Sequence, residues 1–344
     1  MPDISINTDF TTLRSMIVWL YEIINSLNFM LFVFFIIPFI ITLAIMPHII
    51  RKLKDNGFTA KDMYKSGLPE VAVNGGIIIL LVSLFSVSVI SLFYCNYIEP
   101  ANYVIITVVT LFALFGILDD MIDIGRPAKL ILLYYCSYSL IACNTATSVY
   151  MPFIGTTDLG ILYIQLILPL YVPVVANLVN MHSGFNGMAP GLSLIILITL
   201  IAKTMIDGEI LPVLYIVTLT GTLAGYWFFE KYPAKIFWGN IGALSVGAAI
   251  GSIIVVEGFL FSGFVMLIPH TVNFLLYIFW RINSRKYPVA KFGKINPDGT
   301  LEVPNALTLK WVLPYYFPMK EKRATDVMYI LTIIFCAAGL FIPG

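Results

Sequence analysis

The segment Gly116-Ile-Leu-Asp119-Asp120-Met-Ile-Asp123 closes an apolar run that covers residues 103–118. A helix continued through this segment would place Asp119 and Asp123 four residues apart, so three carboxylates would crowd one helix end. Carboxylates that close repel one another unless a cation lies among them, which makes a divalent metal or a basic substrate group the expected partner. Oxygen ligands alone favour Mg²⁺ or Mn²⁺ over zinc. The simpler interpretation is a solvated helix end.

Apolar residues make up 59% of the 344-residue chain, and charged residues make up only 11%. A soluble domain of this length cannot bury so much apolar surface, so the composition predicts a polytopic membrane protein in contact with a lipid bilayer. The formal net charge of +1 gives no indication of a nucleic-acid partner. The four cysteines lie in or beside apolar runs without metal-ligand or paired spacing, which indicates small core residues.

Ten apolar segments are long enough to span a bilayer, which takes about 20 residues each. They cover residues 17–46, 72–93, 101–118, 129–149, 160–178, 189–206, 210–229, 238–256, 259–281 and 325–342. No internal repeat or low-complexity tract is evident, which predicts one integral membrane domain over residues 1–344. The first segment is too long for the apolar region of a signal peptide, so no cleavable signal is expected. The predicted fold class is therefore an all-α polytopic membrane protein with about ten transmembrane helices.

Lys and Arg residues are distributed unevenly between the two sides that alternate along this topology. All of the 20 except Arg14 and Lys203 fall in, or at the edge of, alternate gaps. These gaps cover residues 47–71, 119–129, 179–188, 230–237 and 282–324. The positive-inside rule places these gaps in the cytoplasm and both termini outside. Because nearly all unusual polar residues lie in the same gaps, the working face of the protein is expected to be cytoplasmic.

Two of these gaps carry charged residues next to the start of a span. Glu70 follows Pro69 shortly before a glycine pair, and it is predicted to cap the backbone N–H groups of the next helix. The bases of the same gap, including Lys61, suit a phosphate or an anionic lipid, although ordinary membrane anchoring explains them as well. Lys129 lies at the mouth of the next span, where it would neutralise the acids or hold a phosphate. An ion pair with Asp123 is the structural alternative.

The gap 179–188 has the most distinctive pattern. Asn177 and Asn180 are three residues apart at a helix end, so their carboxamides share one face. Three glycines and a proline follow by residue 191, and glycines before a helix start favour a phosphate-binding backbone. His182 has no partner visible in the sequence, so a merely polar role is favoured over a catalytic one.

The last two gaps contain a helix start and a turn. The segment Phe237-Trp238-Gly239-Asn240 opens an apolar run, which places Asn240 at a helix N-terminus with capping as the structural alternative. The longest and most basic gap, 282–324, contains Asn296-Pro297-Asp298-Gly299 between alternating segments. This pattern predicts a small cytoplasmic β-hairpin between the last two spans, within a basic lid able to clamp a diphosphate.

Together these motifs resemble the polyprenyl-phosphate N-acetylhexosamine-1-phosphate transferase superfamily, also called glycosyltransferase family 4. That superfamily includes the bacterial phospho-MurNAc-pentapeptide translocase and the eukaryotic and archaeal UDP-GlcNAc:dolichyl-phosphate GlcNAc-1-phosphate transferases. The first gap is more similar to the dolichyl-phosphate branch. The residues that carry the resemblance are Lys61-Asp62, Pro69-Glu70, Asp119-Asp120, Lys129, Asn177, Asn180, Gly184, Asn186-Gly187, Gly191 and Phe237-Trp238-Gly239.

The resemblance implies transfer of GlcNAc-1-phosphate from UDP-GlcNAc to a polyprenyl phosphate such as dolichyl phosphate. The products would be lipid-diphospho-GlcNAc and UMP, and the reaction would be the first step of lipid-linked oligosaccharide synthesis for N-glycosylation. It also implies a requirement for Mg²⁺, with Mn²⁺ as a substitute, and an active site on the cytoplasmic face of the cell membrane. A homodimer is left open.

The resemblance also implies roles for individual residues. Asn180 and Asn240 would ligate the metal, and Lys129 would hold a phosphate. Asp119 and Asp120 would lie beside the acceptor phosphate or bind the metal indirectly. The implied substrate-binding residues are Lys61, Glu70, Asn177, Asn186, Gly187, Arg285 and Lys286. Of these, Asn186 would contact the uracil, and Arg285 and Lys286 the sugar and diphosphate.

The chain departs from the family pattern Phe-x-Gly-Asp at Asn240. A neutral carboxamide is a poorer Mg²⁺ ligand than a carboxylate, so this position predicts reduced or abolished activity. A binding-only homologue is therefore one rival hypothesis, and a transporter or lipid flippase is another. The transporter is less favoured, because transporters bury polar groups at mid-membrane and this chain gathers them on one side.

Overall fold

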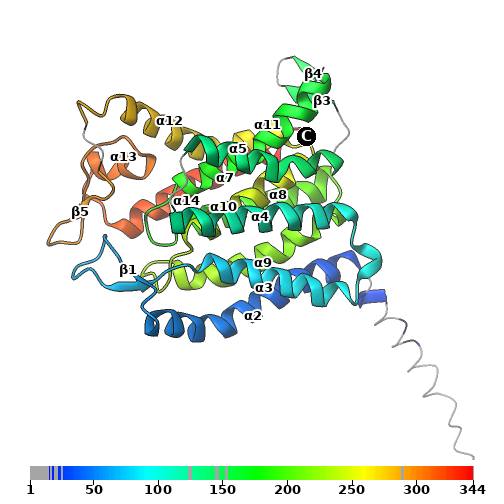
Figure 1. Ribbon diagram of the computed structural model, residues 1–344, viewed down its shortest axis with the longest axis horizontal. Coiled ribbons are helices and arrows are strands. Elements are labelled where there is room, and N and C mark those ends of the chain that lie inside the picture. The colour runs from blue at the N-terminus through cyan, green and yellow to red at the C-terminus, as the bar shows by residue number, and fades with distance from the viewer. Residues whose placement is uncertain are drawn as a thin grey trace, which may run out of the picture.

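The computed structural model describes residues 15, 18, 22–24, 26–122, 126–143, 147–151, 154–287 and 290–343. Asp123, the third carboxylate expected at the helix end, lies outside these residues. The described chain is mostly helical (Figure 1). Its longer helices are α2 (Leu27–Asp55), α3 (Gly76–Ser91), α4 (Pro100–Ile122), α5 (Arg126–Ser137), α7 (Leu168–Met181), α8 (Met188–Asp207), α9 (Leu214–Glu230), α10 (Gly239–Val256), α12 (Ile268–Ile282) and α14 (Glu321–Leu340). Shorter helical elements are η1 (Cys95–Tyr97), η2 (Tyr138–Cys143), α6 (Gly160–Leu162), η3 (Tyr163–Ile167), η4 (Leu211–Val213), α11 (Leu260–Met266) and α13 (Leu309–Tyr316).

Each of the ten expected spans coincides with helix, but the lengths differ. Among the described residues, seven helices are long and apolar enough to cross a membrane. An eighth span would be the pair α11 and α12, which is bent by 67°. The segments Gly76–Ser91 and Ala128–Cys143 are shorter apolar helices, and they occupy the spans expected at 72–93 and 129–149. The multi-pass helical fold is thus confirmed, whereas the count of ten remains a prediction.

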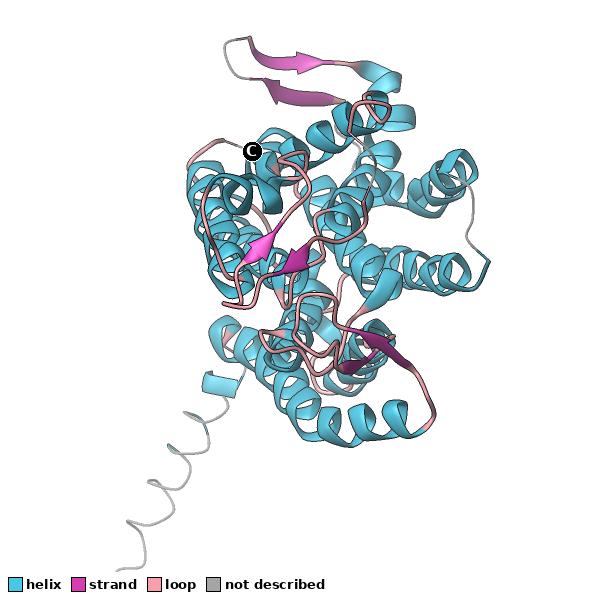
Figure 2. Ribbon diagram, turned by 90° about the vertical axis from the view of Figure 1, so that its left-hand side faces the viewer, coloured by secondary structure: helices cyan, strands magenta, loops and turns pink. Residues whose placement is uncertain are grey.

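Three antiparallel strand pairs lie outside the helical bundle (Figure 2). They are β1 (Thr59–Lys61) with β2 (Glu70–Ala72), β3 (Ser148–Met151) with β4 (Gly155–Asp158), and β5 (Lys294–Ile295) with β6 (Leu301–Glu302). In the third pair Lys294 lies opposite Glu302, on either side of the turn at residues 296–299. Glu70 belongs to a strand, and the residue that precedes α3 is Gly75, which makes no side-chain cap. The predicted capping role of Glu70 is therefore wrong, because the chain stays extended after Pro69.

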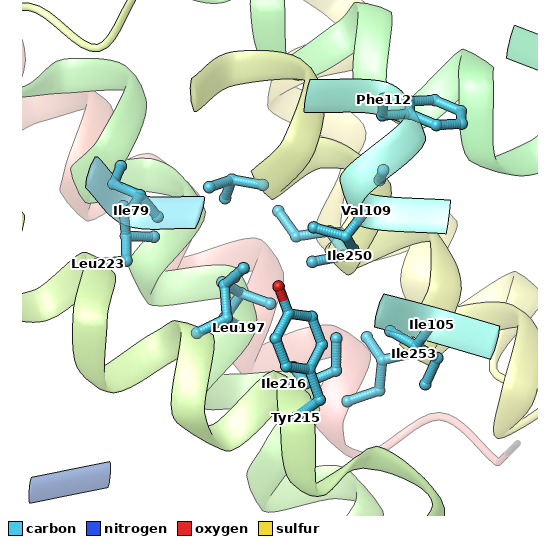
Figure 3. Packing of buried hydrophobic residues seen from close by; sticks show 14 of the residues in the cluster. Ile79, Ile105, Val109, Phe112, Leu197, Tyr215, Ile216, Leu223, Ile250 and Ile253 are labelled. Carbon is cyan, nitrogen blue, oxygen red and sulfur yellow. The ribbon is translucent and has the colours of Figure 1, made fainter. Parts of the chain in front are cut away.

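Helix α10 lies at the centre of the bundle and packs against α4 and α7. A Cβ atom on its Gly247 would lie only 2.6 Å from the Cα atom of Ala176 in α7, so the backbones touch where glycine removes the side chain. Small residues allow this approach in membranes, where helices gain little from apolar burial alone. In the core of the bundle, buried side chains from α3, α4, α8, α9 and α10 pack together (Figure 3).

The first turn of α10 is held between the start of α3 and the end of α4. The backbone N–H groups of Gly75 and Gly76 donate to the carbonyls of Phe237 and Trp238, both at 2.9 Å. A Cβ atom on Gly76 would lie 2.1 Å from the backbone nitrogen of Gly242, so no larger residue fits there without displacing backbone. This contact fixes where α10 begins.

We expect Gly76→Ala to destabilise the protein, because its Cβ atom would collide with backbone and not with a movable side chain. Overpacking of this kind typically costs about 1–3 kcal/mol. A thermal melt of the detergent-purified protein should show a clearly lower midpoint. Ser88→Ala, on the exposed side of the same helix, is the matched control and should leave the midpoint unchanged. Equal midpoints for Gly76→Ala and wild type would contradict the close contact.

Candidate active site

Five polar side chains from four helices meet at one end of the bundle. The Lys129 ammonium lies 2.7 Å from Asp119 Oδ2. The Asn240 amide donates to Asp119 Oδ2 at 3.2 Å and to Asp120 Oδ1 at 2.7 Å. Its own oxygen accepts a hydrogen bond of 3.1 Å from the Asn180 amide. The end of α4, the start of α5, the end of α7 and the start of α10 thus supply one connected network.

The network bears on two alternatives that the sequence left open. Lys129 pairs with Asp119, and the alternative partner, Asp123, lies outside the residues that the structure describes. Asn240 is the second residue of α10, and its side chain bonds carboxylates instead of capping the helix, whose N-cap residue is Trp238. Both carboxylates have side-chain donors, so a bare solvated helix end does not fully describe this site, although Asp120 is also exposed to solvent.

Local packing explains why these elements meet. A Cβ atom on Gly116, one turn before Asp119, would lie 2.8 Å from the Cα atom of Ile241, so glycine lets α4 approach the first turn of α10. The segment before α10 is held by Glu230, which is buried and accepts hydrogen bonds from Tyr226 Oη at 2.7 Å and the Trp238 N–H at 3.0 Å. Glu230 was not among the predicted site residues, although an acid at the end of an apolar run is visible in the sequence.

A groove of about 690 Å³ opens beside this network. Its walls are one face of α7, one face of α12 and the start of α5, which lie near one another at the same end of the molecule (Figure 1). The lining residues are Lys129, Leu130, Val174, Asn177, Leu178, Asn180, Met181, Asn273, Phe274, Tyr277, Ile278, Arg281, Ile282 and Thr308. Most of the wall is apolar, and Lys129 and Asn180 connect it to the carboxylates. Such a shape suits an amphiphile with an anionic head.

Two asparagines of the groove wall form hydrogen bonds with backbone groups. The Asn177 amide donates to the carbonyl of Pro173 at 2.7 Å within α7. Asn273 is buried in α12; it donates to the carbonyl of Met181 at 3.1 Å and accepts from the Leu309 N–H at 2.9 Å. Asn273 therefore fastens the end of α7 and the start of α13 to the bent helix, a role that the sequence analysis did not foresee.

Asn186 lies in a different, buried cluster. Its amide donates to Asp62 Oδ2 at 3.1 Å, and its side-chain oxygen accepts from the Ala234 N–H at 2.9 Å. Its backbone N–H donates to Glu321 Oε1 at 2.7 Å, and Lys65 pairs with both acids. These side-chain bonds use one N–H of the amide and one lone pair of its oxygen, and the predicted contact of Asn186 with a uracil stays a prediction. The observed role is to tie three loops to the start of α14.

Gly187, the next residue, has a backbone φ of 68°. A Cβ atom there would lie 2.7 Å from the Cα atom of Lys231. Glycine is therefore needed at this position for packing of the loop, whatever it contributes to a ligand.

Four other predicted substrate contacts lie outside the groove wall. Lys61 and Glu70 lie opposite each other in the β1–β2 pair, and both are exposed. The Glu70 carboxylate accepts a hydrogen bond from Thr59 Oγ1 at 3.0 Å. Arg285 and Lys286 are exposed in the turn that follows α12. None of the four lines the groove, whereas Arg281, at the end of α12, does.

Two further polar residues border the loop after α7. Lys310 donates to the carbonyl of Ser183 at 2.6 Å, and burial lowers the pKa of its ammonium to about 8, against the opposing effect of Glu321. Burial likewise lowers the pKa of His182 well below its usual range, so its ring is neutral near pH 7. The ring packs edge-on against His270, with 4.6 Å between centroids. No described residue bonds either ring nitrogen of His182, which favours the structural interpretation of this residue.

The sequence of this chain is similar to a known protein family and to several named proteins. The sequence pattern of glycosyl transferase family 4 fits residues 102–258, which run from α4 through α10. A Saccharolobus solfataricus protein, provisionally named a UDP-N-acetylglucosamine–dolichyl-phosphate N-acetylglucosaminephosphotransferase, is 31% identical over 89% of this chain and 95% of its own length. A Sulfolobus acidocaldarius protein with the same provisional name is 31% identical over 79% of this chain and 84% of its own.

The similarity also extends to bacteria. The phospho-N-acetylmuramoyl-pentapeptide-transferase of Clostridium kluyveri is 26% identical over 80% of this chain and 84% of its own length. The match to the Saccharolobus solfataricus protein covers nearly the whole of both proteins, and the family pattern covers the helices that carry Asp119, Lys129, Asn180 and Asn240. This chain belongs to glycosyl transferase family 4.

Proposed function

We propose that this chain transfers GlcNAc-1-phosphate from UDP-GlcNAc to a polyprenyl phosphate of the dolichyl type. The products are lipid-diphospho-GlcNAc and UMP, and the reaction begins the synthesis of lipid-linked oligosaccharide for N-glycosylation. The names of the two archaeal relatives support the substrates. The distribution of Lys and Arg supports an active site on the cytoplasmic face, with both termini outside.

One observation carries the proposal: a carboxylate, amide and ammonium network lies at the edge of an apolar groove. Lys129 and Asn180 belong to both. A lipid phosphate needs an apolar surface for its chain and polar groups for its head, and the same polar groups can position a second, water-soluble phosphate donor. The bundle brings these two environments together at the end of α4.

The chemistry follows from the substrates. A phosphate monoester has a second pKa near 6, so most of the acceptor is a dianion at neutral pH and needs no general base. Its oxygen forms a bond to the β-phosphorus of UDP-GlcNAc, and the bond from that phosphorus to the UMP oxygen breaks. The residues here would orient the two phosphates and offset their charge, which are the main contributions expected of such a site. Lys129 would supply positive charge, and Asn180 would supply a polar contact at the groove.

We further propose Mg²⁺ as cofactor, with Mn²⁺ as a substitute. Within the described ranges, no three His, Cys, Asp or Glu side chains are grouped to hold a metal, so the ligand set would be mixed. Asp119 and Asp120 fit it through carboxylate oxygens, and Asn180 fits through its side-chain oxygen. Asn240 turns its NH₂ group toward the acids, so its oxygen would become a ligand only if the amide turned over. A bound cation would offset the charge of the diphosphate.

The first test is transfer itself. The purified chain should move label from UDP-[³H]GlcNAc into an organic extract, and only when both a polyprenyl phosphate and a divalent cation are present. Asp119→Asn should lower kcat about 100-fold or more, because it removes charge from the centre of the network. Asp55→Asn, an exposed acid at the end of α2, is the matched control and should keep full activity.

The same assay separates the rival functions. Accumulation of label inside proteoliposomes without a lipid product would favour a transporter. Binding of UDP-GlcNAc without any product would favour the binding-only homologue. Either result would refute the transferase.

The second test concerns Asn240. Asn240→Asp would place a third carboxylate at hydrogen-bond distance from Asp119 and Asp120, where like charges repel. We expect a lower melting midpoint than wild type in EDTA, a larger rise on adding Mg²⁺, and faster Mg²⁺-dependent release of UMP. Asn240→Leu, which has neither amide nor charge, should show no such gain. If Mg²⁺ shifted the variant and the wild type equally, residue 240 would not lie at the cation site.

A further inference from the structure

Arg281 is an exposed residue on the face of α12 that lines the groove. We propose that its guanidinium binds the phosphate of the lipid acceptor in the groove. This inference rests on the proposed function, because it names the residue that recognises one of the two substrates. Three features of the groove support it: the direction of the helix faces, the distribution of charge, and the continuity of apolar surface.

The two long walls of the groove each present one helix face. The residues of α7 that line it are Val174, Asn177, Leu178, Asn180 and Met181, and those of α12 are Asn273, Phe274, Tyr277, Ile278, Arg281 and Ile282. Steps of three and four residues keep side chains on one side of a helix. Arg281 is therefore aligned with Phe274 and Ile278 along the wall, even though it lies in the last turn of α12.

Charge distinguishes Arg281 from the other groups in the wall. Among the described residues, Lys129 is the only other cation that lines the groove, and its charge is offset by Asp119 at 2.7 Å. Within the part of the chain that the structure describes, the Arg281 side chain forms neither a salt bridge nor a hydrogen bond. The positive charge available to an entering anion is therefore at Arg281.

Each amide of the wall already donates one hydrogen bond within the protein. Asn177 donates to Pro173, Asn180 donates to Asn240, and Asn273 bonds backbone on both sides. A guanidinium, by contrast, has five donors in a planar fork that matches two phosphate oxygens at once. Arg281 thus offers the strongest anion contact of the wall without breaking any bond of the folded protein.

The apolar residues around Arg281 indicate that the phosphate it binds is part of a lipid. Ile278 is 37% exposed and Ile282 is 77% exposed, and Leu130 and Val174 across the groove are each 43% exposed. This open apolar surface next to a cation fits a hydrocarbon chain attached to a phosphate better than it fits a sugar or a base. The structural alternative is an arginine that only anchors α12 among anionic lipid headgroups.

The test compares binding of a short-chain polyprenyl phosphate with binding of the corresponding polyprenol, which lacks the phosphate. Native mass spectrometry of the full-length protein in detergent, without nucleotide, gives both affinities. Wild type should prefer the phosphate at least tenfold. Arg281→Gln should lose that preference and keep polyprenol binding, and Arg281→Lys should keep part of it. Arg323→Gln, an exposed arginine on α14 away from the groove wall, should behave as wild type.

Steady-state kinetics and UDP binding complete the test. Arg281→Gln should raise KM for the lipid phosphate at least tenfold with little change in KM for UDP-GlcNAc. An unchanged phosphate preference, or equal loss of both lipids, would overturn the proposal. Weaker binding of UDP alone would assign Arg281 to the nucleotide and overturn it too. If wild type transferred no sugar but its phosphate preference depended on Arg281, the subsite would stand while the proposed reaction failed.

Discussion

The site depends on a steric condition, the close approach of three backbones around the first turn of α10. Gly76 and Gly116 place α3 and α4 so near this turn that a single added carbon would meet backbone atoms at 2.1 Å and 2.8 Å. Helices in a bilayer gain little from apolar burial against each other, so such packing contacts decide where they meet. With α10 fixed in this way, Asn240 comes within hydrogen-bond distance of the carboxylates that end α4.

The electrostatic consequence is a site that is organised before any ligand arrives. Two adjacent carboxylates at a helix end repel each other, and here Lys129 and the Asn240 amide offset that repulsion. Asn180 extends the network to the end of α7 and so to the groove. Because every member is tied to another, displacing one element would disturb the whole network. A carboxamide at residue 240 is consistent with this arrangement, since it donates to acids that a carboxylate would repel.

Away from the network, polar side chains hold loops together. Asn186 joins Asp62, the segment at Ala234 and the start of α14, and Asn273 joins α7 to α13. These hydrogen bonds connect the loops and helix ends to one another. Asparagine suits this work because one side chain both donates and accepts without a charge that would have to be buried.

The sequence alone determined the membrane class, the presence of helix within each expected segment, and the acids, amides and lysine that meet at the end of the bundle, because hydropathy and clustered polar residues are local properties. It did not determine the lengths of the helices, because the segments expected at 72–93 and 129–149 contain shorter helices than predicted. It also did not predict that Glu70 lies in a strand. Only the tertiary structure decided which polar groups serve the fold and which remain for a ligand. The Asn186 side chain proved to be bonded to Asp62 and Ala234, whereas the Arg281 side chain forms no hydrogen bond or salt bridge among the described residues, because hydrogen-bond partners are supplied by segments far apart in the chain.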